Sequence, residues 1–143
     1  MKNNFFLKVE FSRIAELIDF LVQHCEELRI TREGENAGIE ARGLEMDAAL
    51  SARLAILYPE IEVNIIEDGK RERFEPDLPV TLRGILNCPN PNCVTSQPRE
   101  PALPEFVVVS RRPILLLCTY CGRYLNQKGI TAELFKVNKK VPL

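Results

Sequence analysis

The chain has almost no net charge, because 19 Lys and Arg residues balance 20 Asp and Glu residues to a formal charge of -1 at pH 7. Composition therefore gives no support for a nucleic-acid-binding protein, although a local basic patch stays open. Long apolar runs are absent too. None approaches the ~20 residues that a membrane-spanning helix needs, and "MKNNFFLKVEF" lacks the apolar stretch of a signal peptide. We expect a cytoplasmic protein that does not contact membranes.

Residue patterns for common catalytic chemistry are also missing. The single histidine, His24, and its neighbour Cys25 have no partner at metal-ligand spacing, and both are expected to be ordinary helix residues. No phosphate loop of the form GxxxxGK followed by Ser or Thr is present. Acids on the first strand and helix, such as Glu10 and Glu16, are mostly surface or capping groups. The sequence therefore predicts a protein that is not an enzyme.

The first half of the chain alternates between strand and helix patterns. A strand is expected at 5–10, followed by a helix over 13–28 with Ser12 as its N-cap. Further expected elements are a strand at 28–32, a strand at 37–42, a helix over 45–60 and a strand at 61–66. This order predicts a ferredoxin-like βαββαβ domain, in which two helices cover one face of a four-stranded antiparallel sheet.

The composition changes after residue 67. The segment 69–79, "GKRERFEPDLP", is charged and rich in proline, and it predicts either a connector or an edge strand. Cysteine, proline and β-forming residues dominate beyond it. We place a boundary near 76–83, which gives domains at 1–80 and 81–143. The overall prediction is an α+β protein whose second domain is a small all-β zinc ribbon of the rubredoxin-like type.

Four cysteines in the second half form two close pairs. Four residues separate Cys88 from Cys93, two separate Cys118 from Cys121, and 24 lie between the pairs. Each pair can wrap a backbone turn around one ion, and together they predict one structural Zn²⁺ held by four thiolates, with no open position for a substrate. An iron–sulfur cluster also takes four thiolates. Two disulfides fit a reducing cytosol less well.

The insert between the cysteine pairs predicts a hairpin. Segments 106–109 and 114–117 are apolar and β-forming, and they flank "SRRP". Arg111 and Arg112 at the tip raise the alternative of a nucleic-acid-binding ribbon. No aromatic ladder accompanies them, as a single-strand binder would require, so nucleic acid is the less favoured partner.

"CPNPNC" at 88–93, followed by "CTYC" at 118–121, resembles the zinc domain of the regulatory chain of aspartate carbamoyltransferase. That family's signature is CPNxNC, a two-stranded excursion of similar length and then CxYC. "LAILYPEIEVNII", "DLP" and, near the start, "LKVE" and "LID" also fit the family's pattern. The resemblance is close over 54–125, moderate over 7–21 and poor over 22–53.

The resemblance implies a non-catalytic subunit of pyrimidine biosynthesis. Family members join catalytic trimers through the zinc domain, and their first domains pair with each other through their sheets. The first domain binds CTP and ATP and changes the affinity state of the catalytic chain, which is allostery between two sites. The positions that the family uses against the catalytic chain map to Asn90, Asn92 and Arg123, although the two asparagines could also only shape the cysteine turn. The family's nucleotide positions map to Val9, Glu10, Asp19 and Arg73.

The sequence departs from the family at the nucleotide site. Asn36 and Glu40 stand where the family has lysines, and an acid repels a triphosphate. Phe20 replaces a histidine, which removes a hydrogen-bonding group. Regulation by CTP or ATP is therefore the least supported part of the prediction. A divergent relative that serves another protein partner, and a zinc-ribbon nucleic-acid binder, remain as alternatives.

Overall fold

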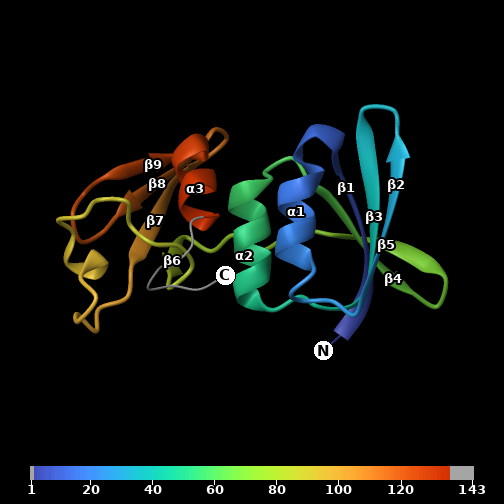
Figure 1. Cartoon of the computed structure of the whole chain (residues 1–143), viewed down its shortest axis with the longest axis horizontal. Helices are drawn as coiled ribbons and strands as arrows, with labels where there is room; N and C mark the ends of the chain where they lie inside the picture. The colour runs from blue at the N-terminus through green and yellow to red at the C-terminus, as the bar shows by residue number, and fades with distance from the viewer. Residues whose placement is uncertain (1, 136–143) are drawn as a thin grey trace. The chain divides into compact units, whose positions relative to one another are not determined.

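The computed structural model describes residues 2–135, and it divides into two compact units (Figure 1). The first unit contains the described residues up to Ser51 together with Glu60–Pro76. The second contains Ala52–Pro59 together with the described residues from Asp77 onward. The second unit therefore includes a short segment that lies, in the sequence, between the two parts of the first unit.

The first unit is built on a five-stranded sheet with the order β2-β3-β1-β4-β5, in which all neighbours are antiparallel. Its strands are β1 (Lys2–Glu10), β2 (Glu27–Glu33), β3 (Asn36–Glu45), β4 (Glu62–Glu67) and β5 (Lys70–Phe74). The first four strands, with α1 (Ile14–Leu21) and α2 (Ala48–Leu57), form the predicted ferredoxin-like βαββαβ arrangement. The charged segment after residue 67 was predicted to be either a connector or an edge strand, and it forms the edge strand β5.

Alternating burial along β1 defines the core of this unit. Phe5, Leu7 and Val9 are buried, whereas the residues between them are at least partly exposed. Leu17 and Leu21 of α1 are fully buried as well, so α1 places its apolar stripe in the core. Figure 1 shows α1 lying over one face of the sheet.

The first helix is shorter than predicted. A 3₁₀ turn, Phe11–Arg13, leads out of β1, so Arg13 is the N-cap residue of α1 and the expected cap by Ser12 does not form. The helix ends at Leu21, and the backbone N–H of His24 donates to the Leu21 carbonyl at 2.9 Å to close the following turn. His24 and Cys25 therefore lie in the connection to β2. The apolar spacing in the sequence extends beyond Leu21, and for this reason the predicted helix was too long. The helix ends at Leu21 because the chain must reverse direction to reach β2.

Helix α2 begins at an aspartate cap and is buried on most sides. The Asp47 carboxylate accepts the N–H of Leu50 at 2.7 Å, which satisfies an otherwise free amide of the first turn. Buried residues cover several faces of the helix, namely Leu50, Ser51, Ala52, Arg53, Leu54, Ile56 and Leu57. The predicted amphipathic pattern is therefore incomplete, because this helix has little solvent-facing surface.

The second unit contains a four-stranded antiparallel sheet with the order β6-β7-β8-β9. Its strands are β6 (Thr81–Arg83), β7 (Glu105–Arg111), β8 (Ile114–Cys118) and β9 (Tyr124–Asn126). The pairing of β7 with β8 confirms the predicted hairpin.

The expectation that the second domain is all β is wrong in one respect, because helix α3 (Gln127–Leu134) follows β9 directly. The side-chain Oδ1 of Asn126, the N-cap residue, accepts the N–H of Gly129 at 3.0 Å and starts the helix. Ile130 and Leu134, one turn apart, are both buried and hold it in place. Within residues 2–135, none of the helices has the length and apolar character required to cross a bilayer.

Candidate metal centre

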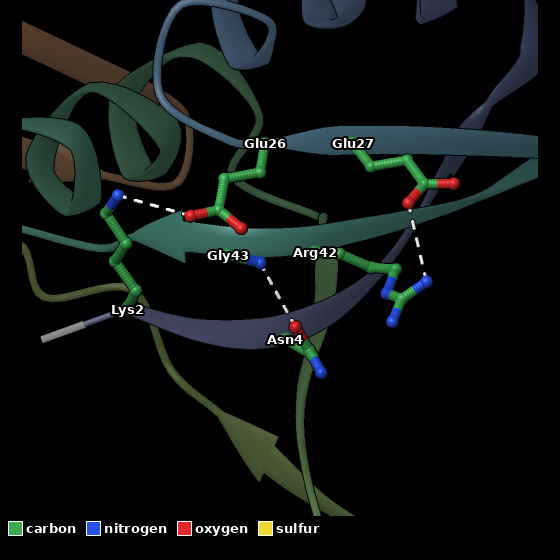
Figure 2. A pocket seen from close by; sticks show the side chains of 6 residues that line it. All are labelled: Lys2, Asn4, Glu26, Glu27, Arg42 and Gly43. Carbon is green, nitrogen blue, oxygen red and sulfur yellow. Dashed lines mark hydrogen bonds and ion pairs between the residues drawn. The ribbon is translucent and has the colours of Figure 1, made fainter.

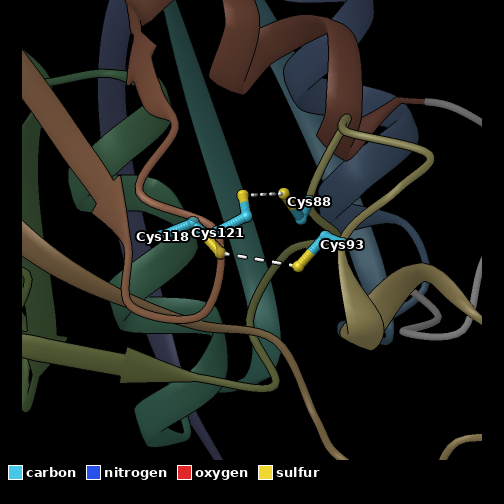
Figure 3. A group of neighbouring side chains, drawn as sticks. All are labelled: Cys88, Cys93, Cys118 and Cys121. Carbon is cyan, nitrogen blue, oxygen red and sulfur yellow. Dashed lines mark hydrogen bonds between the residues drawn. The ribbon is translucent and has the colours of Figure 1, made fainter.

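The two cysteine pairs come together in the second unit (Figure 3). Cys88 and Cys93 lie in the loop after β6, Cys118 ends β8, and Cys121 lies in the turn that follows. All four Sγ atoms lie within 4.8 Å of one another. The sulfur–sulfur distance is 3.6 Å from Cys88 to Cys121 and 3.8 Å from Cys93 to Cys118. Both of these contacts join a cysteine of the first pair to one of the second.

This arrangement fits a four-coordinate metal ion. A tetrahedral site with metal–sulfur bonds of ~2.3 Å has sulfur–sulfur edges of ~3.8 Å, close to the two distances given above. Three of the residues are well buried, with relative exposures of 5% for Cys88, 2% for Cys93 and 1% for Cys118. Cys25 belongs to the first unit and is not part of the cluster. The donor set is therefore four thiols at the spacing that a metal ion requires.

The backbone of the first cysteine loop turns its amides toward the cluster. The N–H of Asn90 is hydrogen-bonded to the Cys88 sulfur, and the N–H of Cys93 donates to the Asn90 carbonyl at 3.1 Å. The Ser96 hydroxyl lies 3.1 Å from the Cys88 carbonyl and 2.8 Å from the Asn90 carbonyl, to which it donates. Ser96 therefore ties the turn after Cys93 to the first half of the loop.

The second cysteine loop follows the same plan. The N–H groups of Tyr120 and Cys121 point to the Cys118 sulfur, and the N–H of Gly122 donates to the Cys118 carbonyl at 2.9 Å. Gly122 has a φ of 77°, a left-handed conformation that glycine adopts without steric cost. A glycine at this point lets the chain leave the loop and enter β9.

The thiols differ in their acidity. Burial raises the pKa of Cys88 and of Cys118, in spite of the backbone amides that hydrogen-bond to each sulfur. Burial also acts to raise the pKa of Cys121, but hydrogen bonds with the Asn90 side chain, the Arg123 N–H and the Cys88 and Cys118 sulfurs together outweigh it and lower that pKa to about 7. Burial penalises the thiolate form, so a cation among the sulfurs offsets the charge that they carry as ligands.

Sequence reasoning missed two hydroxyl residues that support the cluster. The Thr95 side chain is 1% exposed, and its Oγ1 lies 3.1 Å from the Cys93 Sγ. Ser96 binds the loop carbonyls as described above. A hydroxyl residue two positions after a metal-ligating cysteine is a signal that could have found Thr95, because the short turn Val94–Ser96 folds it back onto the sulfur.

The residues predicted to meet a protein partner lie around the cluster in two different settings. Asn90 is half-buried, its side chain hydrogen-bonds to Cys121, and its Oδ1 accepts the N–H of Asn92 at 3.0 Å. This is the turn-shaping role that sequence reasoning considered for it. Asn92 and Arg123 are exposed, and Tyr120, three positions before Arg123, is 48% exposed. The surface at the cysteine loops therefore offers both polar and aromatic groups.

The residues predicted for nucleotide binding do not gather in one place. Val9 is buried in the core, whereas Glu10 and Asp19 are exposed. In the sheet, Arg73 lies opposite Asn64 and Asn64 lies opposite Phe6, so the three side chains share one face. Val9 is an odd number of positions from Phe6 along β1, so its side chain points to the opposite face. Arg73 also forms an ion pair with Glu75 at 3.3 Å. The set does not form a cation-lined recess.

One cavity of about 390 Å³ lies at an end of the sheet (Figure 2). Its charges are paired with one another: Lys2 contacts Glu26 at 3.3 Å, and Arg42 contacts Glu27 at 3.4 Å. The N–H of Gly43 donates to Asn4 at 3.0 Å. These internal contacts leave it without an uncompensated charge to attract a ligand.

A second cavity, of about 360 Å³, lies on the face of the sheet to which Phe6 points. Three acids and two cations line it, together with uncharged residues; the charged residues are Glu33, Glu40, Glu62, Lys8 and Arg71. The Arg71 guanidinium lies over the Phe6 ring, 4.2 Å from its centre. Because acids outnumber cations, this cavity opposes the entry of a triphosphate.

Comparison with known proteins agrees with the geometry of the cluster. A family model described as the aspartate carbamoyltransferase regulatory chain, metal binding domain, matches residues 80–131. Curated relatives carry the name aspartate carbamoyltransferase regulatory chain. The Hyperthermus butylicus relative is 36% identical over 129 residues, which cover 87% of this chain and 74% of the relative.

Two further archaeal relatives align over shorter segments. The Thermofilum pendens protein is 44% identical over 85 residues, 57% of this chain and 52% of the relative. The Korarchaeum cryptofilum protein is 36% identical over 104 residues, 71% of this chain and 65% of the relative. Less than two thirds of the length of these two relatives is covered. With the longer match to the Hyperthermus protein and with the cysteine cluster, they establish that this chain belongs to the family of aspartate carbamoyltransferase regulatory chains and carries its metal-binding domain.

Proposed function

We propose that the chain is a non-catalytic regulatory and assembly subunit that docks on the catalytic chain of aspartate carbamoyltransferase through a structural zinc domain. Cys88, Cys93, Cys118 and Cys121 are the four ligands of one Zn²⁺ ion. The compartment is the cytoplasm, where the thiols stay reduced. The first unit, which carries the five-stranded sheet, pairs with its copy in a second subunit, and the metal-binding unit carries the docking surface.

The observation that carries this proposal is the closed shell of four sulfurs with exposed residues on its loops. Four protein ligands leave no position for water or substrate, which favours a structural over a catalytic metal. Asn92 and Arg123 are exposed, and they belong to the two cysteine loops, whose sulfurs lie within 4.8 Å of one another. Tyr120 adds an aromatic side chain of the kind that is enriched at protein interfaces.

Docking is tested by mixing the full chain with the catalytic trimer of the same organism, and by following the mass with light scattering. We expect a complex that forms with zinc and dissociates when a chelator removes it. A second sample without chelator but at the same ionic strength controls for salt. Absence of a complex at every mixing ratio would leave a divergent relative that serves another partner.

Asn92→Ala separates docking from metal binding. The Asn92 side chain is exposed, so its removal should leave the zinc content unchanged and weaken the complex by about tenfold or more, as truncation of a hot-spot residue does. Asn90→Ala is the matched comparison, because Asn90 hydrogen-bonds to Cys121 and its loss should change metal retention as well. Unaltered docking by Asn92→Ala would remove this residue from the interface.

Nucleotide control is the part of the family function that we do not assign to this chain. A triphosphate requires cations. Glu40, which lines the cavity of about 360 Å³, is an acid, and Arg73 already forms an ion pair with Glu75. Titration calorimetry with CTP and with ATP should give no saturable heat at micromolar concentrations. Micromolar binding that Asp19→Ala abolishes would reverse this assignment.

Nucleic-acid binding is the second candidate, and one contact disfavours it. Of the two hairpin arginines, Arg111 donates from its guanidinium to the Leu78 carbonyl at 2.8 Å, so it holds the linker segment against the hairpin. A gel-shift titration with single- and double-stranded oligonucleotides at about 150 mM salt should show no complex, because the chain has a net charge of -1 and Arg111 is held by the Leu78 carbonyl.

A further inference from the structure

The Thr95 side chain is placed as a donor to one of the four sulfurs. It is 1% exposed, and its hydroxyl lies 3.1 Å from the Cys93 Sγ. No other hydrogen bond of this hydroxyl is found among residues 2–135. A buried hydroxyl without a hydrogen-bond partner is destabilising, so the conformation of Thr95 depends on the sulfur.

The direction of this hydrogen bond follows from the chemistry of the cluster. Cysteine binds metal as a thiolate, which has no proton to donate. The hydroxyl must therefore be the donor and the sulfur the acceptor whenever the metal is bound. A hydrogen bond to a charged acceptor is stronger than one between neutral groups.

Each of the other three sulfurs has at least one backbone N–H donor. Cys88 receives the Asn90 amide, Cys118 receives the amides of Tyr120 and Cys121, and Cys121 receives the Arg123 amide and the Asn90 side chain. Those backbone donors come with the fold of the loops and do not depend on residue type. Thr95 supplies its donor from a side chain, so its contribution is open to a single substitution.

We propose that Thr95 is a positioning residue of the metal site, whose hydroxyl orients the Cys93 thiolate and slows loss of the metal. The proposal rests on the assignment of the four cysteines as ligands. Partners of metal ligands of this kind typically change metal affinity by 10–100-fold when they are removed.

The test uses the full chain loaded with Co²⁺, whose thiolate charge-transfer absorption reports on the sulfurs directly. Thr95→Val keeps the shape of the side chain and removes the hydroxyl, and Thr95→Ser keeps the hydroxyl. We expect Thr95→Val to move the charge-transfer band to longer wavelength, because a sulfur without its hydrogen bond gives up an electron more easily. A competing chelator should remove the metal 10–100-fold more readily from this variant, and Thr95→Ser should behave as the wild type.

Ser96→Ala is the matched control. The Ser96 hydroxyl donates to loop carbonyls and not to a sulfur, so its removal should ease metal loss but leave the charge-transfer band in place. If Thr95→Val does not fold, Thr95→Ala lacks the same hydroxyl in a smaller side chain and takes its place. Wild-type absorption and wild-type retention in the folded variant would overturn the proposal, and so would loss of folding in Thr95→Ser. Failure of the wild type to take up Co²⁺ would instead refute the metal site itself.

Discussion

Gln127 illustrates how one side chain supports a helix end in this protein. Its amide donates to the carbonyls of Ile56 and Leu57, at 2.8 and 3.2 Å, and so satisfies two of the acceptors that the C-terminal turn of α2 leaves free. The side chain comes from the first residue of α3, more than 60 positions later in the chain. No local sequence pattern indicates such a pairing.

Gln127→Ala should lower the free energy of unfolding by about 1–3 kcal/mol, because both carbonyls lose a donor. Gln127→Glu should cost at least as much, since a carboxylate cannot donate and is repelled by the negative end of a helix. Urea unfolding of the metal-loaded protein measures both.

Gln23→Ala serves as a control for these variants. Its amide makes only a 3.4 Å exposed contact to the Asp19 carbonyl, so its loss should stay within about 0.5 kcal/mol. Equal stability of Gln127→Ala and wild type would mean that water replaces the amide at the helix end.

Residues at the metal site show what the sequence could and could not predict. The spacing of the four cysteines is enough to predict them as metal ligands, because two close cysteine pairs in one chain are typical of a metal site. Thr95 and Ser96 look like any other loop residues in sequence. Their role depends on the short turn after Cys93, which directs one hydroxyl to a sulfur and the other to the loop carbonyls.

At the scale of elements, strongly patterned segments were predicted and short ones were missed. The alternation of strand and helix over 5–66 was enough to predict the ferredoxin-like order. Strands of three residues, such as β6 and β9, are too short to carry a pattern. Helix α3 has a glycine in its first half, which lowers helix propensity, and it forms because Ile130 and Leu134 are buried.

Gly129→Ala should stabilise α3 by about 0.5–1 kcal/mol, because alanine has the higher helix propensity. A Cβ at this position would meet the Asn126 Oδ1 and the Leu125 Cγ at 3.6 Å, an ordinary contact distance. Thermal unfolding followed by circular dichroism should show a rise in the midpoint.

The same substitution at Gly69 is the contrasting control. Gly69 has a φ of 77°, so Gly69→Ala should destabilise by about 1 kcal/mol through backbone strain although the space there is open. Destabilisation by Gly129→Ala would indicate that the packing around α3 is tighter than these distances imply.

At the scale of the whole molecule, the two compact units do not follow the order of the sequence. Residues 52–59 belong with the metal-binding unit, and two of their contacts illustrate this: Arg53 donates to the Ile85 carbonyl at 3.1 Å, and Gln127 donates to Ile56. A single boundary near 76–83 follows naturally from composition. Composition cannot indicate that one helix is divided between two units.

Removal of the metal should therefore unfold a discontinuous part of the chain. After chelation, hydrogen exchange measured by mass spectrometry should rise in residues 77–135 and also in residues 52–59, because small units depend on their metal for stability. Residues 2–51 and 60–76 should stay largely protected. Replacing Cys25 by serine, outside the cluster, should change neither pattern. Continued protection of 52–59 after the metal is lost would assign that segment to the first unit.

The division of α2 between the units also constrains how relatives could exchange parts by recombination. A chimera that takes its metal-binding unit from another family member needs three junctions, after Ser51, after Pro59 and after Pro76. A single junction at the linker would join residues 52–59 of one parent to the sheet and α3 of the other. Inheritance of the metal-binding unit as one block therefore requires a stretch of helix encoded well upstream of the cysteines.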